Sequence, residues 1–190
     1  MNYSSSISNE RYEEIKNAVA DMYEDLGYEK IPVNVFELCH KLNIKLIRYS
    51  SLNVRCAEYS IQFSKDGFNL LNINTSQYQI YYNDFMPIER VNFTIMHEIG
   101  HIMLGHKKHT RESELEANFY ARTALAPLGL IAKLKLENSN EVAATFGISS
   151  ECAKNIVMNY NKMLVYPTIR NRELNSRLVR HFSNNHQEVI

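Results

Sequence analysis

The stretch on which the fold and the chemistry depend reads Thr94-Ile95-Met96-His97-Glu98-Ile99-Gly100-His101. On a helix, His97 and His101 are four residues apart and lie one above the other on the same face. Two imidazoles held in this way can supply two of the three protein ligands of a catalytic zinc ion, whose fourth position stays open for water. Glu98 lies beside them, where its carboxylate could take a proton from that water. The motif therefore predicts a zinc site with Glu98 as its catalytic carboxylate; the alternative is an ordinary helix with two surface histidines.

The residues around the motif favour the metal site over that alternative. Pro87 suits a helix start, and the helix is predicted to run to about Gly105. Its apolar residues share one stripe: Ile88, Val91, Ile95, Ile99 and Ile102. The histidines fall on a polar strip on roughly the opposite side, so we expect a largely buried helix whose histidines point into the protein and need partners. Gly100 is unfavourable inside a helix, which suggests that a neighbour approaches the backbone there.

A third metal ligand has to come from elsewhere, and the next predicted helix, from residue 111 to just before Pro127, offers acidic side chains. A short turn makes this helix antiparallel to the first, so its early turns can lie across from the histidines. Glu112 and Glu116 share a face with Tyr120, whereas Glu114 points elsewhere. Helical phase alone therefore leaves Glu112 or Glu116 as the ligand. Glu116 sits deeper in the helix, although it could instead complete a capping box with Ser113. His106 and His109, near the end of the first helix, are expected to be solvated.

The order and spacing of these motifs resemble the ImmA/IrrE family of bacterial metallopeptidases. The resemblance rests on His97-Glu98-Ile99-Gly100-His101, then Glu114-x-Glu116-Ala117-Asn118-x-Tyr120-Ala121 and Leu125-x-Pro127, with Arg90-x-x-Phe93-Thr94 and Leu71-x-Ile73-Asn74 before them. It covers roughly residues 30–160 and implies a zincin-like fold with Zn²⁺ on His97, His101 and Glu116, and Glu98 as the catalytic carboxylate. It also implies a protein substrate, a helix-turn-helix repressor of a mobile element or a stress regulon. Tyr120 stands where the family usually has phenylalanine.

The remaining segments predict an α+β fold, in which a small mixed or antiparallel sheet packs on the helix that carries the motif. Helices are expected over 8–26 and 33–42, and strands over 44–49, 57–63 and 68–74, with a hairpin turn at Asp66-Gly67 and a tyrosine-rich connection over 75–86. In zinc peptidases of this class, an edge strand beside the active-site helix pairs with the substrate backbone, and the strand over 68–74 is a candidate for that role.

The C-terminal third predicts a helical annex after the peptidase core. A helix over 128–136 is followed by an alanine-rich helix, a glycine turn and a serine-capped helix within 139–158, which has the outline of a helix-turn-helix. Its second helix offers only Lys154 and Asn155 as obvious base-reading residues, so we expect no DNA binding. The predicted domains are 1–128 (zincin-like metallopeptidase), 129–166 (annex) and 167–190 (a C-terminal tail, helical or flexible).

Composition limits the class of protein further. The formal net charge is zero, so bulk charge favours neither nucleic acid nor an anionic membrane as a partner. The three cysteines are far apart and odd in number, which favours a reducing compartment, and no apolar run is long enough to span a membrane. We expect a cytoplasmic, monomeric zinc endopeptidase. The alternative is a non-proteolytic module with structural zinc that sequesters a repressor or contacts DNA through 139–158.

Overall fold

The computed structural model describes residues 7–183, which form two compact units. The first unit comprises Ile7 and Asn34–Ala121, and the second comprises Ser8–Val33 and residues 122–183, so the division falls within helix α5 (Arg111–Leu125). The predicted boundaries after residues 128 and 166 differ from this division and stay a prediction. In the described part of the chain, no helix combines the length and the apolar character needed to cross a membrane.

The first unit is built on a three-stranded mixed sheet, which confirms the predicted α+β class. Its strands are β1 (Lys45–Arg48), β2 (Gly67–Asn72) and β3 (Gln77–Tyr82), in the spatial order β1-β3-β2. β1 runs parallel to β3, with Leu46 opposite Ile80, and β2 runs antiparallel to β3, with Phe68 opposite Tyr81. β2 is therefore an edge strand of this sheet.

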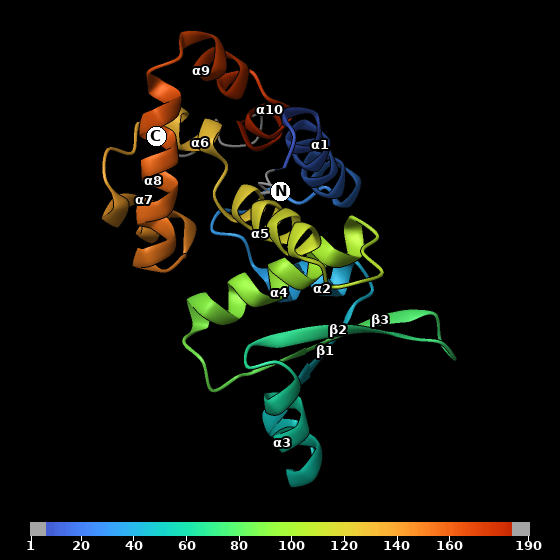
Figure 1. Ribbon diagram of the computed structural model, residues 1–190. Coiled ribbons are helices and arrows are strands. Elements are labelled where there is room, and N and C mark those ends of the chain that lie inside the picture. Colours follow the sequence, from blue (N-terminus) through green and yellow to red (C-terminus); the bar gives the residue numbers. More distant parts are fainter. Residues whose placement is uncertain (1–6, 184–190) are drawn as a thin grey trace, which may run out of the picture. The chain divides into compact units, whose positions relative to one another are not determined.

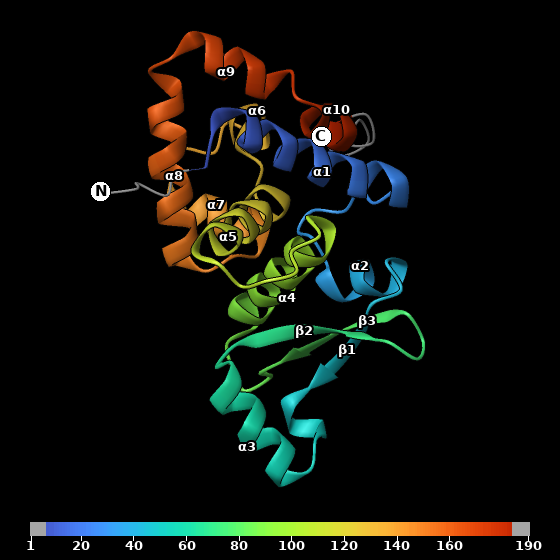
Figure 2. The ribbon, with the colours of Figure 1, turned by 45° about the vertical axis from the view of Figure 1, so that its right-hand side comes forward.

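Helices lie on both sides of the sheet in the first unit. Helix α4 (Ile88–Met103), which carries the histidine motif, packs against β2 and β3, and α2 (Val35–Lys41) packs against α4 and β1. Figures 1 and 2 show α4 and α2 on one side of the sheet and α3 (Val54–Phe63) on the other. Ile80, Ile95 and Ile99 are fully buried between the sheet and these helices. The expected largely buried motif helix is thus confirmed.

The predictions for two segments were wrong, a strand over 57–63 and a connection over 75–86. Residues 57–63 belong to α3, which a short 3₁₀ turn, η1 (Tyr49–Ser51), precedes. The Asn53 side chain accepts a hydrogen bond from the Cys56 N–H and caps α3. This N-cap favours a helix, although the residues of the segment are common in strands. The tyrosine-rich segment predicted as a connection contains β3, because Ile80 and Tyr82 alternate into the interior.

The turn prediction was also wrong, since Gly67 lies in a strand and the chain reverses at residues 73–76. There the side chain of Asn72 accepts hydrogen bonds from the backbone N–H groups of Asn74 and Thr75, and Ser76 takes a positive φ of 52°. Asparagine can build such a turn without a glycine.

The second unit is all helical. It contains α1 (Asn9–Leu26), α6 (Leu128–Lys133), α7 (Ser139–Phe146), α8 (Ser150–Leu164), α9 (Pro167–Leu174) and α10 (Arg177–Ser183). α1 packs on α10, and α6 packs on α8, α9 and α10. The predicted α1 is capped as expected, by Ser8 at its start and by Gly27, with a φ of 54°, at its end. The predicted tail is helical over α9 and α10, and residues 184–190 lie outside the described residues.

Candidate metal centre

One face of α4 is fixed against strand β2 at three successive turns. Arg90 donates two hydrogen bonds, of 2.7 and 2.8 Å, to the carboxylate of Asp66. One turn later, a side chain at Gly67 would lie 2.7 Å from the Thr94 methyl carbon, so only glycine permits this approach. Arg90, Thr94 and residue 98 are spaced four apart on one helix face, and this spacing brings residue 98 to β2.

Glu98 is the third point of this contact and is 4% exposed. The Asn69 amide, two residues after Gly67 and on the same face of β2, donates a hydrogen bond of 2.7 Å to Glu98 Oε2. Burial raises the pKa of Glu98, while the Asn69 hydrogen bond and the positive charge of His97 act in the opposite direction. The predicted catalytic carboxylate is thus buried and held in one orientation.

His97 and His101 converge on one acidic side chain, Glu114, near the start of α5. The Nε2 atoms of the two histidines are 3.0 Å apart. One Glu114 oxygen lies 3.3 Å from His97 Nε2 and the other lies 3.3 Å from His101 Nε2. A tetrahedral zinc ion with bonds of about 2.0–2.1 Å separates its ligand atoms by about 3.3 Å, so two imidazoles and a carboxylate at these distances fit such an ion.

The protonation of His101 and Glu114 suits metal binding at neutral pH. Burial, together with the nearby charge of His97, lowers the pKa of His101 to about 4, so its imidazole is neutral and can donate an electron pair. Burial alone would raise the pKa of Glu114, but a hydrogen bond with His109 and the neighbouring histidines outweigh it and lower that pKa. The carboxylate is therefore ionised. His109 is exposed, as expected, and its ring lies 3.0 Å from Glu114.

The structure brings Glu114, rather than the predicted Glu116, to the two histidines. Glu116 Oε2 lies 3.0 Å from His106 Nε2 instead, and Glu112 is exposed. The expectation that Glu114 points away from the histidines was wrong, because the rotation of α5 about its axis is set by packing that helical phase does not reveal. His106, expected to be solvated, is largely buried.

Asn118 was missed as a functional candidate. Its Oδ1 lies 3.2 Å from His97 Nδ1, on the side of the ring away from the proposed metal ligand atom. Glu114 and Asn118 are four residues apart and share a helix face, so this spacing could have pointed to their common role. A hydrogen bond at Nδ1 fixes the orientation and tautomer of a ligand histidine.

Gly100 sets how closely α4 and α5 approach in the first unit. A side-chain carbon at Gly100 would lie 3.1 Å from Tyr120 Cβ and 3.2 Å from its ring atoms Cγ and Cδ1. Tyr120 is fully buried, which supports a packing role for it. The close approach inferred from the sequence is confirmed.

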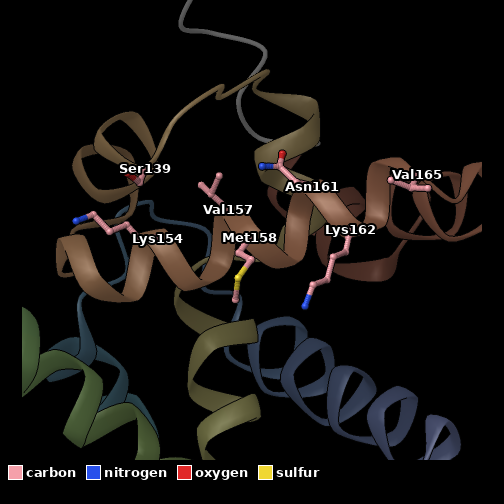
Figure 3. A pocket seen from close by; sticks show the side chains of 7 residues that line it. All are labelled: Ser139, Lys154, Val157, Met158, Asn161, Lys162 and Val165. Atoms are coloured by element: carbon pink, nitrogen blue, oxygen red, sulfur yellow. The ribbon is translucent and has the colours of Figure 1, made fainter.

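The second unit carries a separate surface feature, a hollow of about 550 Å³ along α8. Figure 3 shows that most of its lining side chains lie along α8; Ser139 begins α7, and Val165 directly follows the last residue of α8. Two are cationic, Lys154 and Lys162, and they flank Val157 and Met158. α7 ends at Gly147 with a φ of 62°, and Ser149 caps α8, which confirms the expected helix–turn–helix outline.

The sequence matches a known protein family. Residues 39–158 match the family model of peptidase family M78, described as the IrrE N-terminal-like domain. The match spans the sheet, α4 and α5 and extends into α8, more than half of the 190 residues. No curated protein matches the chain at a significant level.

Proposed function

Because the chain belongs to the IrrE N-terminal-like family of peptidases, we propose that it is a zinc-dependent endopeptidase acting on a regulatory protein. The observation that supports this most directly is the triangle formed by His97, His101 and Glu114. Glu98 is buried beside this triangle, on the helix that carries the two histidines. A structural zinc site has four protein ligands and needs no neighbouring carboxylate, whereas a catalytic site leaves one position open.

We assign the metal to His97 Nε2, His101 Nε2 and a carboxylate oxygen of Glu114, in place of the Glu116 ligand that the sequence suggested. The spacing of these atoms, the neutral imidazole of His101 and the ionised carboxylate of Glu114 support the assignment. When bound, zinc would polarise the scissile carbonyl and lower the pKa of a water molecule.

Glu98 is proposed as the proton carrier. Its carboxylate accepts a proton from the attacking water and passes it to the leaving amine. Burial raises the pKa of this carboxyl above its ordinary value, which favours its taking up the proton of the water. Asn69 keeps Oε2 fixed throughout, so the carboxylate does not turn away from the reacting atoms.

The substrate is proposed to bind as an extended segment along β2. This strand lies at the edge of the sheet, contacts α4 and presents the half-exposed side chains of Leu70 and Leu71. Backbone pairing with an edge strand accepts many sequences, and pockets for alternate side chains would supply selectivity. A helix-turn-helix repressor is the proposed substrate. We further propose that the enzyme is monomeric and acts in the cytoplasm, where its three free cysteines stay reduced.

Incubation with a candidate repressor tests this proposal. The repressor encoded beside the gene would be mixed with zinc-loaded wild-type protein, Glu98→Gln or Glu112→Gln, and new termini would be identified by mass spectrometry. We expect one defined cleavage with the wild type and with Glu112→Gln, whose exposed side chain serves as the matched control, and none with Glu98→Gln.

The same assay separates the peptidase from a binding module that sequesters the repressor or contacts DNA through residues 139–158. Release of repression by wild-type protein while the repressor stays intact would reject the peptidase. Lys154 and Lys162 are the cations through which α8 would meet DNA. If Lys154→Glu with Lys162→Glu abolishes release of repression and leaves the repressor uncut in every case, the binding role is the correct one.

A further inference from the structure

We propose that His106 and Glu116 form a hydrogen-bonded relay that positions the metal ligand His101. This inference rests on the proposed metal centre and gives Glu116 a role behind the first layer of ligands. It makes His106 and Glu116 positioning residues, since they act on the metal only through His101.

The relay is continuous and runs from the metal centre to a buried carboxylate. His101 Nδ1 lies 2.9 Å from His106 Nδ1, and His106 Nε2 lies 3.0 Å from Glu116 Oε2. His101 Nε2, on the opposite side of its ring, faces His97 and Glu114. Each ring therefore uses both of its nitrogens, one toward each neighbour.

Metal binding at His101 determines the direction of both hydrogen bonds in the relay. A neutral imidazole has one donor and one acceptor nitrogen, so a ring that binds metal through Nε2 carries its proton on Nδ1. His101 Nδ1–H then donates to His106 Nδ1. His106 in turn carries its proton on Nε2 and donates to the carboxylate of Glu116, which can only accept when ionised.

Burial explains why both positioning residues are needed. The side chains of His101, His106 and Glu116 are 2%, 11% and 8% exposed. A buried carboxylate is costly without hydrogen-bond donors, and a buried imidazole can turn over if only one nitrogen has a partner. Glu116 fixes the tautomer of His106, and His106 then presents an acceptor to His101.

The two proposed ligand histidines thus have different hydrogen-bond partners at Nδ1. Asn118 lies at Nδ1 of His97, whereas the His106–Glu116 pair lies at Nδ1 of His101. Hydrogen-bond partners of this kind typically contribute 10- to 100-fold to metal affinity.

Zinc affinity and cobalt spectra of the full-length protein test the relay without any substrate. Zn²⁺ affinity would be measured by competition with a chromophoric chelator, and Co²⁺ absorption would report the ligand set. The variants are Glu116→Gln, His106→Ala, His106→Gln, the ligand variant Glu114→Gln and the exposed control Glu112→Gln. Thermal melting followed by circular dichroism would establish that each variant is folded.

We expect Glu116→Gln and His106→Ala to lower zinc affinity about 10- to 100-fold while the cobalt spectrum keeps the shape of the wild type. His106→Gln should retain more affinity than His106→Ala, because an amide offers both an acceptor and a donor. Glu114→Gln should change the spectrum itself, and Glu112→Gln should change neither quantity. Because Glu116→Gln preserves volume, it remains informative if His106→Ala does not fold.

Different results would reject the relay, the proposed metal site and the proposed peptidase activity. Affinities of Glu116→Gln and His106→Gln within twofold of a zinc-binding wild type would reject the relay and leave the proposed function intact. A cobalt spectrum altered by Glu116→Gln but not by Glu114→Gln would make Glu116 a ligand and also reject the relay. Absence of zinc binding by the wild type would reject both, whereas absence of cleavage with the zinc results as expected would reject only the proposed peptidase.

Discussion

Replacing Gly100 with alanine tests whether the contact between α4 and α5 sets the geometry of the proposed metal centre. The added carbon would lie 3.1–3.2 Å from three carbons of Tyr120, against a usual carbon–carbon separation of about 3.5–4.0 Å. Tyr120 is fully buried and cannot swing into solvent. The helices must therefore separate by a few tenths of an ångström, and Glu114 moves away from the histidines with α5.

Two opposing free-energy terms decide the stability of Gly100→Ala. Alanine favours the helix over glycine by about 1 kcal/mol. Overpacking a filled interior costs about 1–3 kcal/mol. Since Tyr120 is fully buried, we expect the second term to dominate, with a net loss of about 1 kcal/mol in the free energy of unfolding.

Urea unfolding of the metal-free protein measures this loss, and a double-mutant cycle with Tyr120→Ala identifies its cause. With the tyrosine ring absent, Gly100→Ala should lose most of its cost or become stabilising, giving a coupling energy of about 1–3 kcal/mol. The same variant should bind Zn²⁺ more weakly in the wild-type background only. A stabilisation by Gly100→Ala that is equal in both backgrounds would refute the packing argument.

Three further outcomes follow from the metal centre, an ion pair and the cysteines. Removing metal with a chelator should lower the melting temperature, and added Zn²⁺ should raise it with concentration, because a ligand that binds only the folded state stabilises it by mass action; an unchanged melting temperature would contradict a zinc site. A hydrogen bond from Arg177 lowers the pKa of Glu24 in the folded protein. This exposed pair therefore stabilises the fold at pH values above the unfolded pKa of 4.5, and its contribution is lost as the pH falls through the lower folded pKa. Arg177→Gln should accordingly cost less than about 1 kcal/mol at pH 7 and still less at pH 3, as urea titrations at both pH values would measure. Burial raises the pKa of the Cys39 thiol to about 12, so at pH 8 a thiol reagent should modify the exposed Cys56 rapidly and Cys39 only on unfolding, as peptide mapping would show.

The histidine motif could be predicted from the sequence because its geometry is local. A spacing of four residues places His97 and His101 together on any helix, and the apolar stripe indicates which face is buried. The partner on α5 could not be predicted in this way, because Glu112 and Glu116 share one face of the helix while Glu114 lies on another. Which face turns inward depends on packing such as that of Tyr120 on Gly100, which joins residues far apart in sequence.

The sheet shows the same limit. Alternation over Ile80 and Tyr82 was hidden by neighbouring tyrosines, which are common in both strands and loops, and α3 was concealed by a composition that favours strands. Local polar contacts mark both places: the Asn53 side chain caps α3, and the Asn72 side chain holds the turn between β2 and β3. The strength of these contacts depends on backbone geometry that composition does not record.

Strand β2 connects substrate binding with proton transfer in the proposed reaction. Its glycine allows the strand to lie against α4, and two residues later Asn69 reaches the carboxylate of Glu98. The face of the strand that holds Glu98 and the open edge that would pair with substrate belong to the same six residues. A substrate segment that shifts or twists β2 on pairing would also move Asn69, and with it the orientation of Glu98. Pairing of the substrate with β2 and the orientation of Glu98 would therefore be coupled. Substrates that pair correctly with the strand would be cleaved in preference to those that do not.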